Sequence, residues 1–214
     1  MNTGLFIVLE GVEGAGKSTQ ARLLSEWFEE LGLSYTLARE PGGTPVGEAI
    51  RRVVLDRGEL TMPPETELFL ILAARAAFVR GVVGPALEEG KVVLADRFDL
   101  STFAYQGFGR GLDLGPVEEA NAMATGGLCP DLYLVLDLAV ETGLERKGGV
   151  KTGDRIEREG VAFLSRVREG YITLAEKVPT VRLIQAGGRS LEVQESIRGA
   201  LVREFPETFS GYGV

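Results

Sequence analysis

Residues 11–18 read Gly-Val-Glu-Gly-Ala-Gly-Lys-Ser and follow the apolar run Leu5-Phe6-Ile7-Val8-Leu9. This is the G-x-x-x-x-G-K-[ST] spacing of a phosphate-binding loop, placed between a predicted strand and a predicted helix. Its three glycines allow backbone N–H groups to turn inward around a polyphosphate, at φ values that a Cβ resists. The N-terminus of the following helix would point at the same anion.

The loop supplies the ligands that a nucleoside triphosphate needs. Lys17 can reach the β- and γ-phosphates, and the Ser18 hydroxyl can bind Mg²⁺. We therefore predict a nucleoside-triphosphate site that also binds Mg²⁺. Its residues are Gly11, Val12, Glu13, Gly14, Ala15, Gly16, Lys17, Ser18 and Thr19.

Composition limits the class of protein. The length of 214 residues suits one domain spanning 1–214. A formal charge of −8 argues against a nucleic-acid partner, which needs a concentrated basic surface. The absence of histidine excludes catalysis by histidine and metal sites with histidine ligands. The single cysteine, Cys129, excludes an internal disulfide, and we expect it to be buried.

No leader-like N-terminus and no apolar run of membrane-spanning length is evident in the sequence. We expect a cytoplasmic protein that binds neither membranes nor nucleic acid.

Apolar runs typical of strands alternate with helical patterns along the chain. We expect strands at Leu5–Leu9, Ser34–Ala38, Val92–Ala95, Leu132–Asp137 and Thr180–Ile184. We expect helices between the first two strands and at Met62–Glu89, Glu159–Lys177 and Leu191–Phe205. This predicts an α/β P-loop three-layer fold with a five-stranded parallel sheet flanked by helices. In such sheets, ligands bind at the carboxyl ends of the strands.

Two clusters follow predicted strands, where that edge should lie. Arg39-Glu40-Pro41-Gly42-Gly43-Thr44 could be a simple turn, but an arginine at a strand end suits a phosphate. Asp96-Arg97 could be a solvated pair, or it could place a carboxylate near Mg²⁺. Since adjacent side chains in extended backbone point apart, we expect Asp96 to serve the metal and Arg97 an acceptor phosphate.

Two further segments carry candidate ligands. Tyr105 and Gln106, in the stretch 101–111, could supply a ring and an amide that read a nucleobase, or could belong to the core. Basic residues surround the glycines at 148, 149 and 153. They could form a solvated loop, or a lid at about 146–157 that brings cations to the transferring phosphoryl group. These residues are Arg146, Lys147, Lys151 and Arg155.

Together these motifs resemble bacterial thymidylate kinases over essentially the whole chain. The resemblance rests on Phe6–Gly11 with the P-loop, Arg39–Thr44, Ala73-Ala74-Arg75, Asp96-Arg97, Ser101 with Ala104–Gly107, and Asp154-Arg155-Ile156-Glu157. It implies transfer of the γ-phosphoryl group of ATP to dTMP in dTTP synthesis, with Mg²⁺, by a homodimer.

The resemblance also implies roles by position. Glu13 would bind the acceptor's 3′-hydroxyl, and Arg75 would contact the thymine edge. Arg39 and Arg97 would hold the acceptor phosphate. Asp96 would organise Mg²⁺ or its waters. The nucleoside pocket would be completed by Ser101, Tyr105 and Gln106, and the catalytic residues would be Lys17, Asp96, Arg97, Arg146 and Arg155.

Two positions depart from the family pattern. Gly14 stands where one branch has an arginine, and the other branch places its catalytic cations in the lid. Ile71 stands where the family stacks an aromatic ring on thymine, which loses a stacking contribution of roughly 1 kcal/mol. We do not expect Phe69 to replace that ring. Ile71 therefore keeps open a kinase for another nucleoside monophosphate or small acceptor. A nucleotide-dependent switch, which uses the same loop without a second substrate, is the alternative from another class.

Overall fold

A computed structural model describes residues 4–56, 60–148 and 155–209. Five parallel strands form one sheet in the order β2-β3-β1-β4-β5, which confirms the predicted fold class. The strands are β1 (Leu5–Glu10), β2 (Tyr35–Arg39), β3 (Val92–Asp96), β4 (Leu132–Asp137) and β5 (Val181–Gln185). Each lies within one residue of its predicted bounds, because continuous apolar runs are typical of strands covered on both faces.

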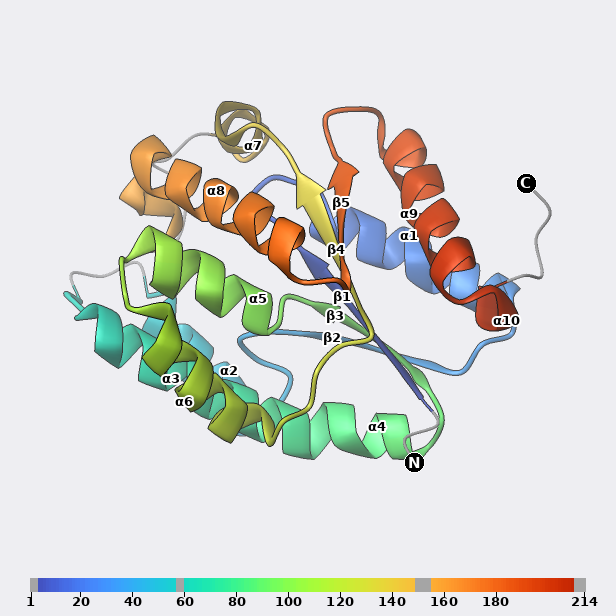
Figure 1. Ribbon diagram of the computed structural model, residues 1–214, viewed down its shortest axis with the longest axis horizontal. Coiled ribbons are helices and arrows are strands. Elements are labelled where there is room, and N and C mark those ends of the chain that lie inside the picture. The colour runs from blue at the N-terminus through green and yellow to red at the C-terminus, as the bar shows by residue number, and fades with distance from the viewer. Residues whose placement is uncertain (1–3, 57–59, 149–154, 210–214) are drawn as a thin grey trace.

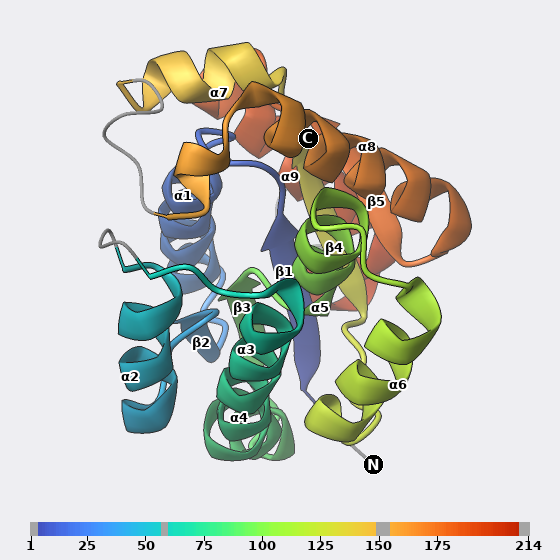
Figure 2. The ribbon, with the colours of Figure 1, turned by 90° about the vertical axis from the view of Figure 1, so that its left-hand side faces the viewer.

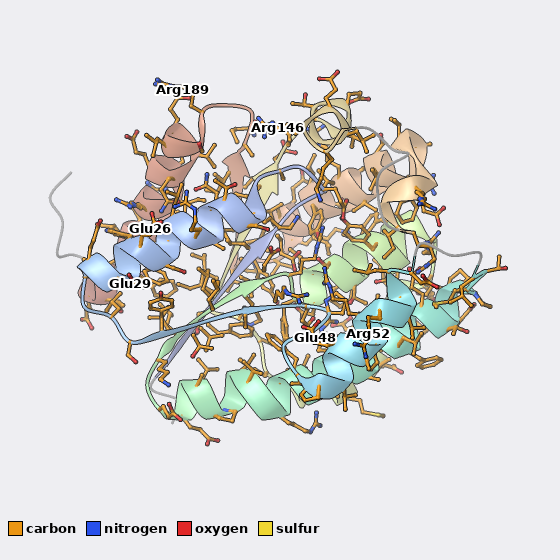
Figure 3. All side chains as sticks on the ribbon, turned by 180° about the vertical axis from the view of Figure 1, so that it is seen from behind. Glu26, Glu29, Glu48, Arg52, Arg146 and Arg189 are labelled. Carbon is orange, nitrogen blue, oxygen red and sulfur yellow. The ribbon has the colours of Figure 1, made fainter. Side chains whose placement is uncertain are left out.

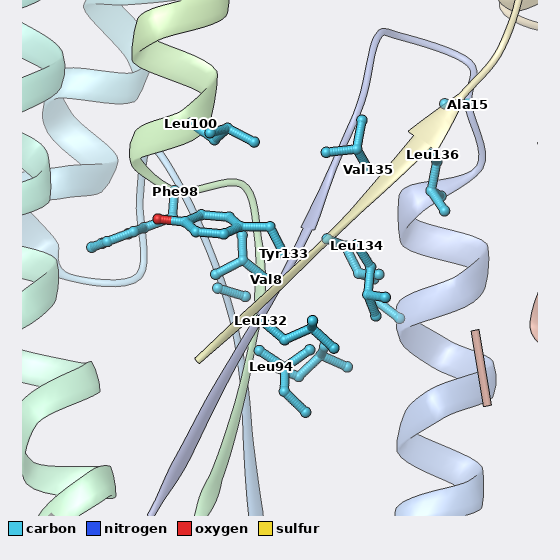
Figure 4. Close-up of a cluster of buried hydrophobic side chains, with 14 of the residues drawn as sticks. Val8, Ala15, Leu94, Phe98, Leu100, Leu132, Tyr133, Leu134, Val135 and Leu136 are labelled. Carbon is cyan, nitrogen blue, oxygen red and sulfur yellow. The ribbon is translucent and has the colours of Figure 1, made fainter. Parts of the chain in front are cut away.

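The three central strands carry the core. Figure 4 shows Tyr133 and Val135 on one side of β4, with Leu134 and Leu136 on the other. All four side chains are buried, which a strand achieves only with helices on both faces.

Helices form the two outer layers. Figure 1 shows α1 and α9 on one face of the sheet and α4, α5 and α8 on the other. Figure 2 shows α2, α3 and α6 side by side, outside the sheet. The helices are α1 (Lys17–Glu30), α2 (Pro45–Val54), α3 (Pro64–Phe78), η1 (Val79–Val83), α4 (Gly84–Glu88), α5 (Asp99–Thr102), η2 (Phe103–Gly109), α6 (Leu114–Thr125), α7 (Val140–Arg146), η4 (Glu157–Glu159), α8 (Val161–Lys177), α9 (Ser190–Glu204) and α10 (Pro206–Phe209).

The register of the sheet brings the predicted ligands to one edge. Leu9, just before the P-loop, and Arg39 both lie opposite Asp96 in the parallel ladders. The ends of β1, β2 and β3 therefore meet at the same level, and the segments that follow them surround one space.

Residues 103–109 form a wide helical turn that the sequence did not indicate. Glycines there disfavour a helix in isolation, but they permit close packing on α8. A Cβ on Gly109 would lie 2.7 Å from the Phe163 ring, and one on Gly170 would lie 2.8 Å from Phe108. Tertiary packing thus outweighs the local preference.

The continuous helical run Pro64–Glu88 corrects the expectation that no apolar run reaches membrane-spanning length. In the described residues it is the one helix whose length of 25 residues and mean hydropathy of 1.7 would allow it to cross a membrane. Core helices of soluble proteins pass the same test, and this run packs against α2 and α6 and carries the buried, ion-paired Arg75. The expectation of a buried Cys129 is also wrong, since that residue is exposed after α6.

Candidate active site

The P-loop adopts the conformation that its glycines predict. Gly11, Gly14 and Gly16 have φ values of 132°, 74° and 99°. A Cβ on Gly14 would lie 2.1 Å from the carbonyl oxygen of Gly143 in α7. A side chain at position 14 would therefore require α7 to move away from the loop.

Lys17 is held at the base of the loop. Its Nζ donates to the carbonyl oxygens of Gly11 at 2.9 Å and Val12 at 3.1 Å. Burial lowers the pKa of Lys17 to about 8, and the nearby Arg97 adds to that effect. A bound polyphosphate would favour the charged ammonium and raise this pKa.

Ser18 and Asp96 bring hard oxygen ligands together beside Lys17. The Ser18 hydroxyl donates to the Asp96 carboxylate at 3.3 Å. Hydroxyl and carboxylate oxygens suit Mg²⁺, which binds through few protein ligands and keeps waters and substrate phosphates. The described residues contain no cluster of three or more His, Cys, Asp or Glu that would form an all-protein metal cage.

Arg97 occupies the centre of a polar cluster. Its Nη1 donates to Ser101 at 3.1 Å and to Tyr171 at 3.2 Å. Its Nη2 donates to Glu13 at 2.8 Å and to the Tyr105 hydroxyl at 3.1 Å. Among the described residues, no partner is found for its Nε–H, so that donor is left for a ligand.

The backbone at Arg97 differs from the extended geometry that we assumed. Among the described residues, it is the one non-glycine residue with a left-handed φ, at 75°. Such backbone costs about 1–3 kcal/mol and concentrates at functional sites. Asp96 and Arg97 do contact different groups, but a sharp turn separates them rather than the alternation of a strand.

The Glu13 side chain points from the P-loop toward Arg97 and Tyr105. Its carboxylate accepts from Arg97 and, at 2.8 Å, from the Tyr105 hydroxyl. Burial opposes ionisation, but Arg97 and Lys17 outweigh it and hold the pKa of Glu13 below its usual value. Glu13 therefore joins the P-loop to the cluster around Arg97.

Sequence reasoning missed two members of this cluster, Glu10 and Tyr171. The buried Glu10 carboxylate accepts from the backbone N–H of Phe98 at 2.9 Å and from the Tyr171 hydroxyl at 2.8 Å. It also accepts from the Ser101 hydroxyl at 2.5 Å. Glu10 directly precedes the loop and could have been noticed as a charge ending an apolar strand, whereas nothing marks Tyr171 on α8.

Arg75 is buried, and all five of its N–H groups are engaged. Nε and Nη2 donate to Glu40 at 2.9 and 2.7 Å. The other three bonds go to the Phe98 carbonyl, Thr102 and Asn121, at 2.9, 2.7 and 2.9 Å. A contact with thymine would require Arg75 to share or exchange one of these bonds.

Arg39 and Ile71 both line the cavity near Arg75. Arg39 is half exposed and donates to both carboxylate oxygens of Glu48, at 3.0 and 3.1 Å. Ile71 is partly buried, whereas Phe69 is 64% exposed and points away, as expected.

Arg146 and Arg155, at the two described ends of the predicted lid, lie apart, and Lys147 lines the cavity with Arg146. Arg146 donates to the carbonyls of Gly14 at 3.4 Å and Ala186 at 3.3 Å, beside the P-loop. Figure 3 shows Arg146 by α7, well separated from Glu48 on α2. Arg155 instead donates to Glu67 and to the Val54 carbonyl, away from the P-loop. Residues 149–154, including Lys151, lie outside the described residues.

A cavity of about 730 Å³ connects these groups. P-loop residues from Glu13 to Thr19 line it, together with Arg146, Ala186 and Ser190. Its lining also includes residues that end or follow β2 and β3, or that belong to α3, α5 and η2. These are Arg39, Glu40, Pro41, Ile71, Arg75, Asp96, Arg97, Phe98, Ser101, Thr102, Tyr105 and Gln106.

The chain is similar to known proteins over almost its full length. The family model described as thymidylate kinase matches residues 9–197. A thymidylate kinase of Symbiobacterium thermophilum is 46% identical over 210 residues, covering 98% of each chain. One from Desulforudis audaxviator is 48% identical over 213 residues, covering 98% of this chain and 96% of its own.

The fold agrees with these sequence matches. The crystal structure of thymidylate kinase from Ehrlichia chaffeensis superposes with a TM-score of 0.76 at 28% identity, covering 92% of this chain and 98% of that one. The P-loop, the cavity and these similarities agree: the chain belongs to the thymidylate kinase family.

Proposed function

We propose that the protein transfers the γ-phosphoryl group of ATP to dTMP, giving dTDP and ADP. One observation carries this proposal: a single cavity is lined both by the P-loop and by Arg97 and Arg39. A phosphoryl transfer between two nucleotides needs two anion sites that share one space. A nucleotide switch has no use for the second site.

The reaction needs positioning more than proton transfer. A phosphate oxygen of dTMP attacks the γ-phosphorus of ATP, and the bond from that phosphorus to the β,γ-bridging oxygen breaks, leaving ADP. Lys17 would neutralise the β- and γ-oxygens, with Arg146 beside the loop. Arg97, with Arg39, would hold the acceptor phosphate in line.

Ser18 and Asp96 would hold Mg²⁺, directly or through waters, and the ion would neutralise charge on the ATP phosphates. The remaining acceptor contacts would come from Glu13 to the sugar and from Ser101, Tyr105 and Gln106 around the nucleoside. A catalytic role for Arg155 stays a prediction, since it would have to leave Glu67 to reach the P-loop.

We also propose that the protein is a cytoplasmic homodimer with neither nucleic-acid nor membrane partners. Large apolar side chains stand exposed on the adjoining helices α3 and α6, with Phe69 at 64% and Met123 at 80%. Burying them against a second copy would remove apolar area from water.

One assay separates the candidate functions. Purified protein receives ATP, Mg²⁺ and each nucleoside monophosphate in turn, and ADP release is followed. Fastest turnover with dTMP supports the proposal. Preference for another acceptor supports the alternative kinase, which Ile71 keeps open, and slow hydrolysis that ignores every acceptor supports the switch.

A further inference from the structure

Glu67 is a buried carboxylate that stands outside the cavity and has no part in the proposed reaction. It lies in the first turn of α3 and is 1% exposed. Its Oε1 accepts from Gln106 Nε2 at 2.8 Å. Its Oε2 accepts from Arg110 Nη2 at 3.0 Å and from Arg155. Two segments distant from α3 in the sequence, residues 106–110 and Arg155, thus meet at this one side chain.

The two arginines keep this carboxylate ionised. Burial raises the pKa of Glu67, but the hydrogen bonds from Arg110, Gln106 and Arg155 outweigh it and lower the pKa below its usual value. An ionised carboxylate has no proton to give and can only accept hydrogen bonds. Any side chain that forms a hydrogen bond with Glu67 must therefore supply the hydrogen-bond donor.

That requirement fixes the side-chain amide of Gln106. The amide has a donor end, Nε2, and an acceptor end, Oε1, and only Nε2 can face Glu67. Gln106 is 1% exposed and lines the cavity. Among the described residues no hydrogen-bond partner is found for its Oε1, so the carbonyl oxygen is the end left for a ligand.

The position of Glu67 on α3 supports a role in reading the base. Glu67, Ile71 and Arg75 are spaced four residues apart, so they lie along one face of the helix. Ile71 and Arg75 line the acceptor part of the cavity directly. Glu67 contributes to the same part indirectly, through Gln106.

We propose that Glu67 is a specificity-determining positioning residue for the acceptor base, an inference that rests on the proposed function. By holding Nε2, it makes the Gln106 carbonyl oxygen the group that meets the base. Thymine and uracil carry a ring N–H that can donate to it. Cytosine has a bare ring nitrogen at the equivalent position, so two acceptors would face each other and both would go unpaired.

The test replaces the carboxylate by an amide of the same shape. In Glu67→Gln, the new side chain can donate or accept, so the Gln106 amide is free to turn over. We expect the ratio of kcat/KM for dTMP to that for dCMP to fall about tenfold, which corresponds to one hydrogen bond. The change should appear in the two KM values, with kcat at saturating dTMP nearly unchanged.

Glu159→Gln is the matched control. Glu159 also pairs with Arg110 but does not contact Gln106, so its loss should leave the selectivity ratio unchanged. Gln106→Leu gives a second check, because adding Glu67→Gln to it should change the ratio no further. Glu67→Asp, which keeps the charge but shortens the reach, should act like Glu67→Gln and serves if that variant does not fold.

A folded Glu67 variant with the wild-type selectivity ratio would overturn the inference. An equal fall of the selectivity ratio in Glu159→Gln would also overturn the inference, because the effect would then follow from loss of packing around Arg110. A wild-type enzyme without dTMP preference would instead count against the proposed function, so the two failures are distinguishable.

Discussion

The Glu13 carboxylate accepts a 2.8 Å hydrogen bond from Arg97, although 84 residues separate the two in the sequence. Glu13 belongs to the P-loop, and Arg97 follows β3. The bond therefore joins the part of the cavity assigned to ATP to the part assigned to dTMP. Because Glu13 and Arg97 are bonded to each other, this contact would hold the donor and acceptor phosphates of the proposed reaction in a fixed relation.

Removing Arg97 should weaken acceptor binding. We expect Arg97→Ala to raise the KM for dTMP by about 10- to 100-fold, because a charge-assisted hydrogen bond to phosphate is lost. The KM for ATP should change much less. Steady-state kinetics with each substrate varied in turn measure both. Unchanged dTMP kinetics would show that the acceptor phosphate binds elsewhere.

Removing Lys17 should lower turnover sharply without unfolding the protein. We expect Lys17→Ala to lower kcat by about 100- to 1000-fold, since the β- and γ-phosphates lose a positioned cation. Within the described part of the chain its hydrogen bonds reach only two backbone carbonyls, so the fold should persist. ADP release gives kcat, and circular dichroism checks the fold. A folded variant with near-normal turnover contradicts the assignment.

ATP binding should depend on pH through Lys17. In the free protein its pKa is about 8, and a bound triphosphate raises it. Above pH 8 the free protein has largely lost this proton, so ATP binding takes one up and affinity falls as the pH rises.

Calorimetry measures this effect. Titrations at pH 8.5 in two buffers of different ionisation enthalpy should show proton uptake by the wild type and less by Lys17→Met. Equal uptake by both proteins would assign the proton to another group.

The buried ion pair of Arg75 and Glu40 should control stability. Arg75→Met leaves the Glu40 carboxylate buried without its partner, and we expect a loss of about 3–5 kcal/mol in the free energy of unfolding. The double variant with Glu40→Gln should recover part of that loss. Urea unfolding measures both, and a single variant as stable as the wild type would disprove the prediction.

Charge on the α3–α6 surface should disrupt self-association. We expect Phe69→Glu to raise the dimer dissociation constant tenfold or more, because a charge replaces a ring that the second copy would bury in the dimer. Leu191→Glu is the control, since Leu191 is 67% exposed on α9. Sedimentation velocity measures self-association of the wild type, Phe69→Glu and Leu191→Glu. Equal association of both variants, or a monomeric wild type, contradicts this surface.

Several residues could be placed from the sequence because their environment is local. The P-loop glycines must adopt left-handed φ values, and Lys17 and Ser18 follow at fixed offsets. Arg39 and Asp96 end strands, and parallel strands bring their ends to one edge. Spacing alone was sufficient for these positions.

Other residues could not be placed this way. The helical turn at 103–109 forms because Gly109 and Gly170 allow close packing on α8, against local preference. Arg155 was expected near the ATP phosphates, but the structure pairs it with Glu67. A long side chain reaches several partners, and packing decides which one it meets.

The sequence by itself determined the parallel sheet, the P-loop and the strand-end residues Arg39 and Asp96 that line the cavity, because strand periodicity and loop chemistry act over a few neighbouring residues. Only the tertiary structure decided the left-handed turn at Arg97, the full engagement of Arg75, and the contact between Glu67 and Gln106. Those features depend on which charged groups are buried together, and burial is a property of the whole fold.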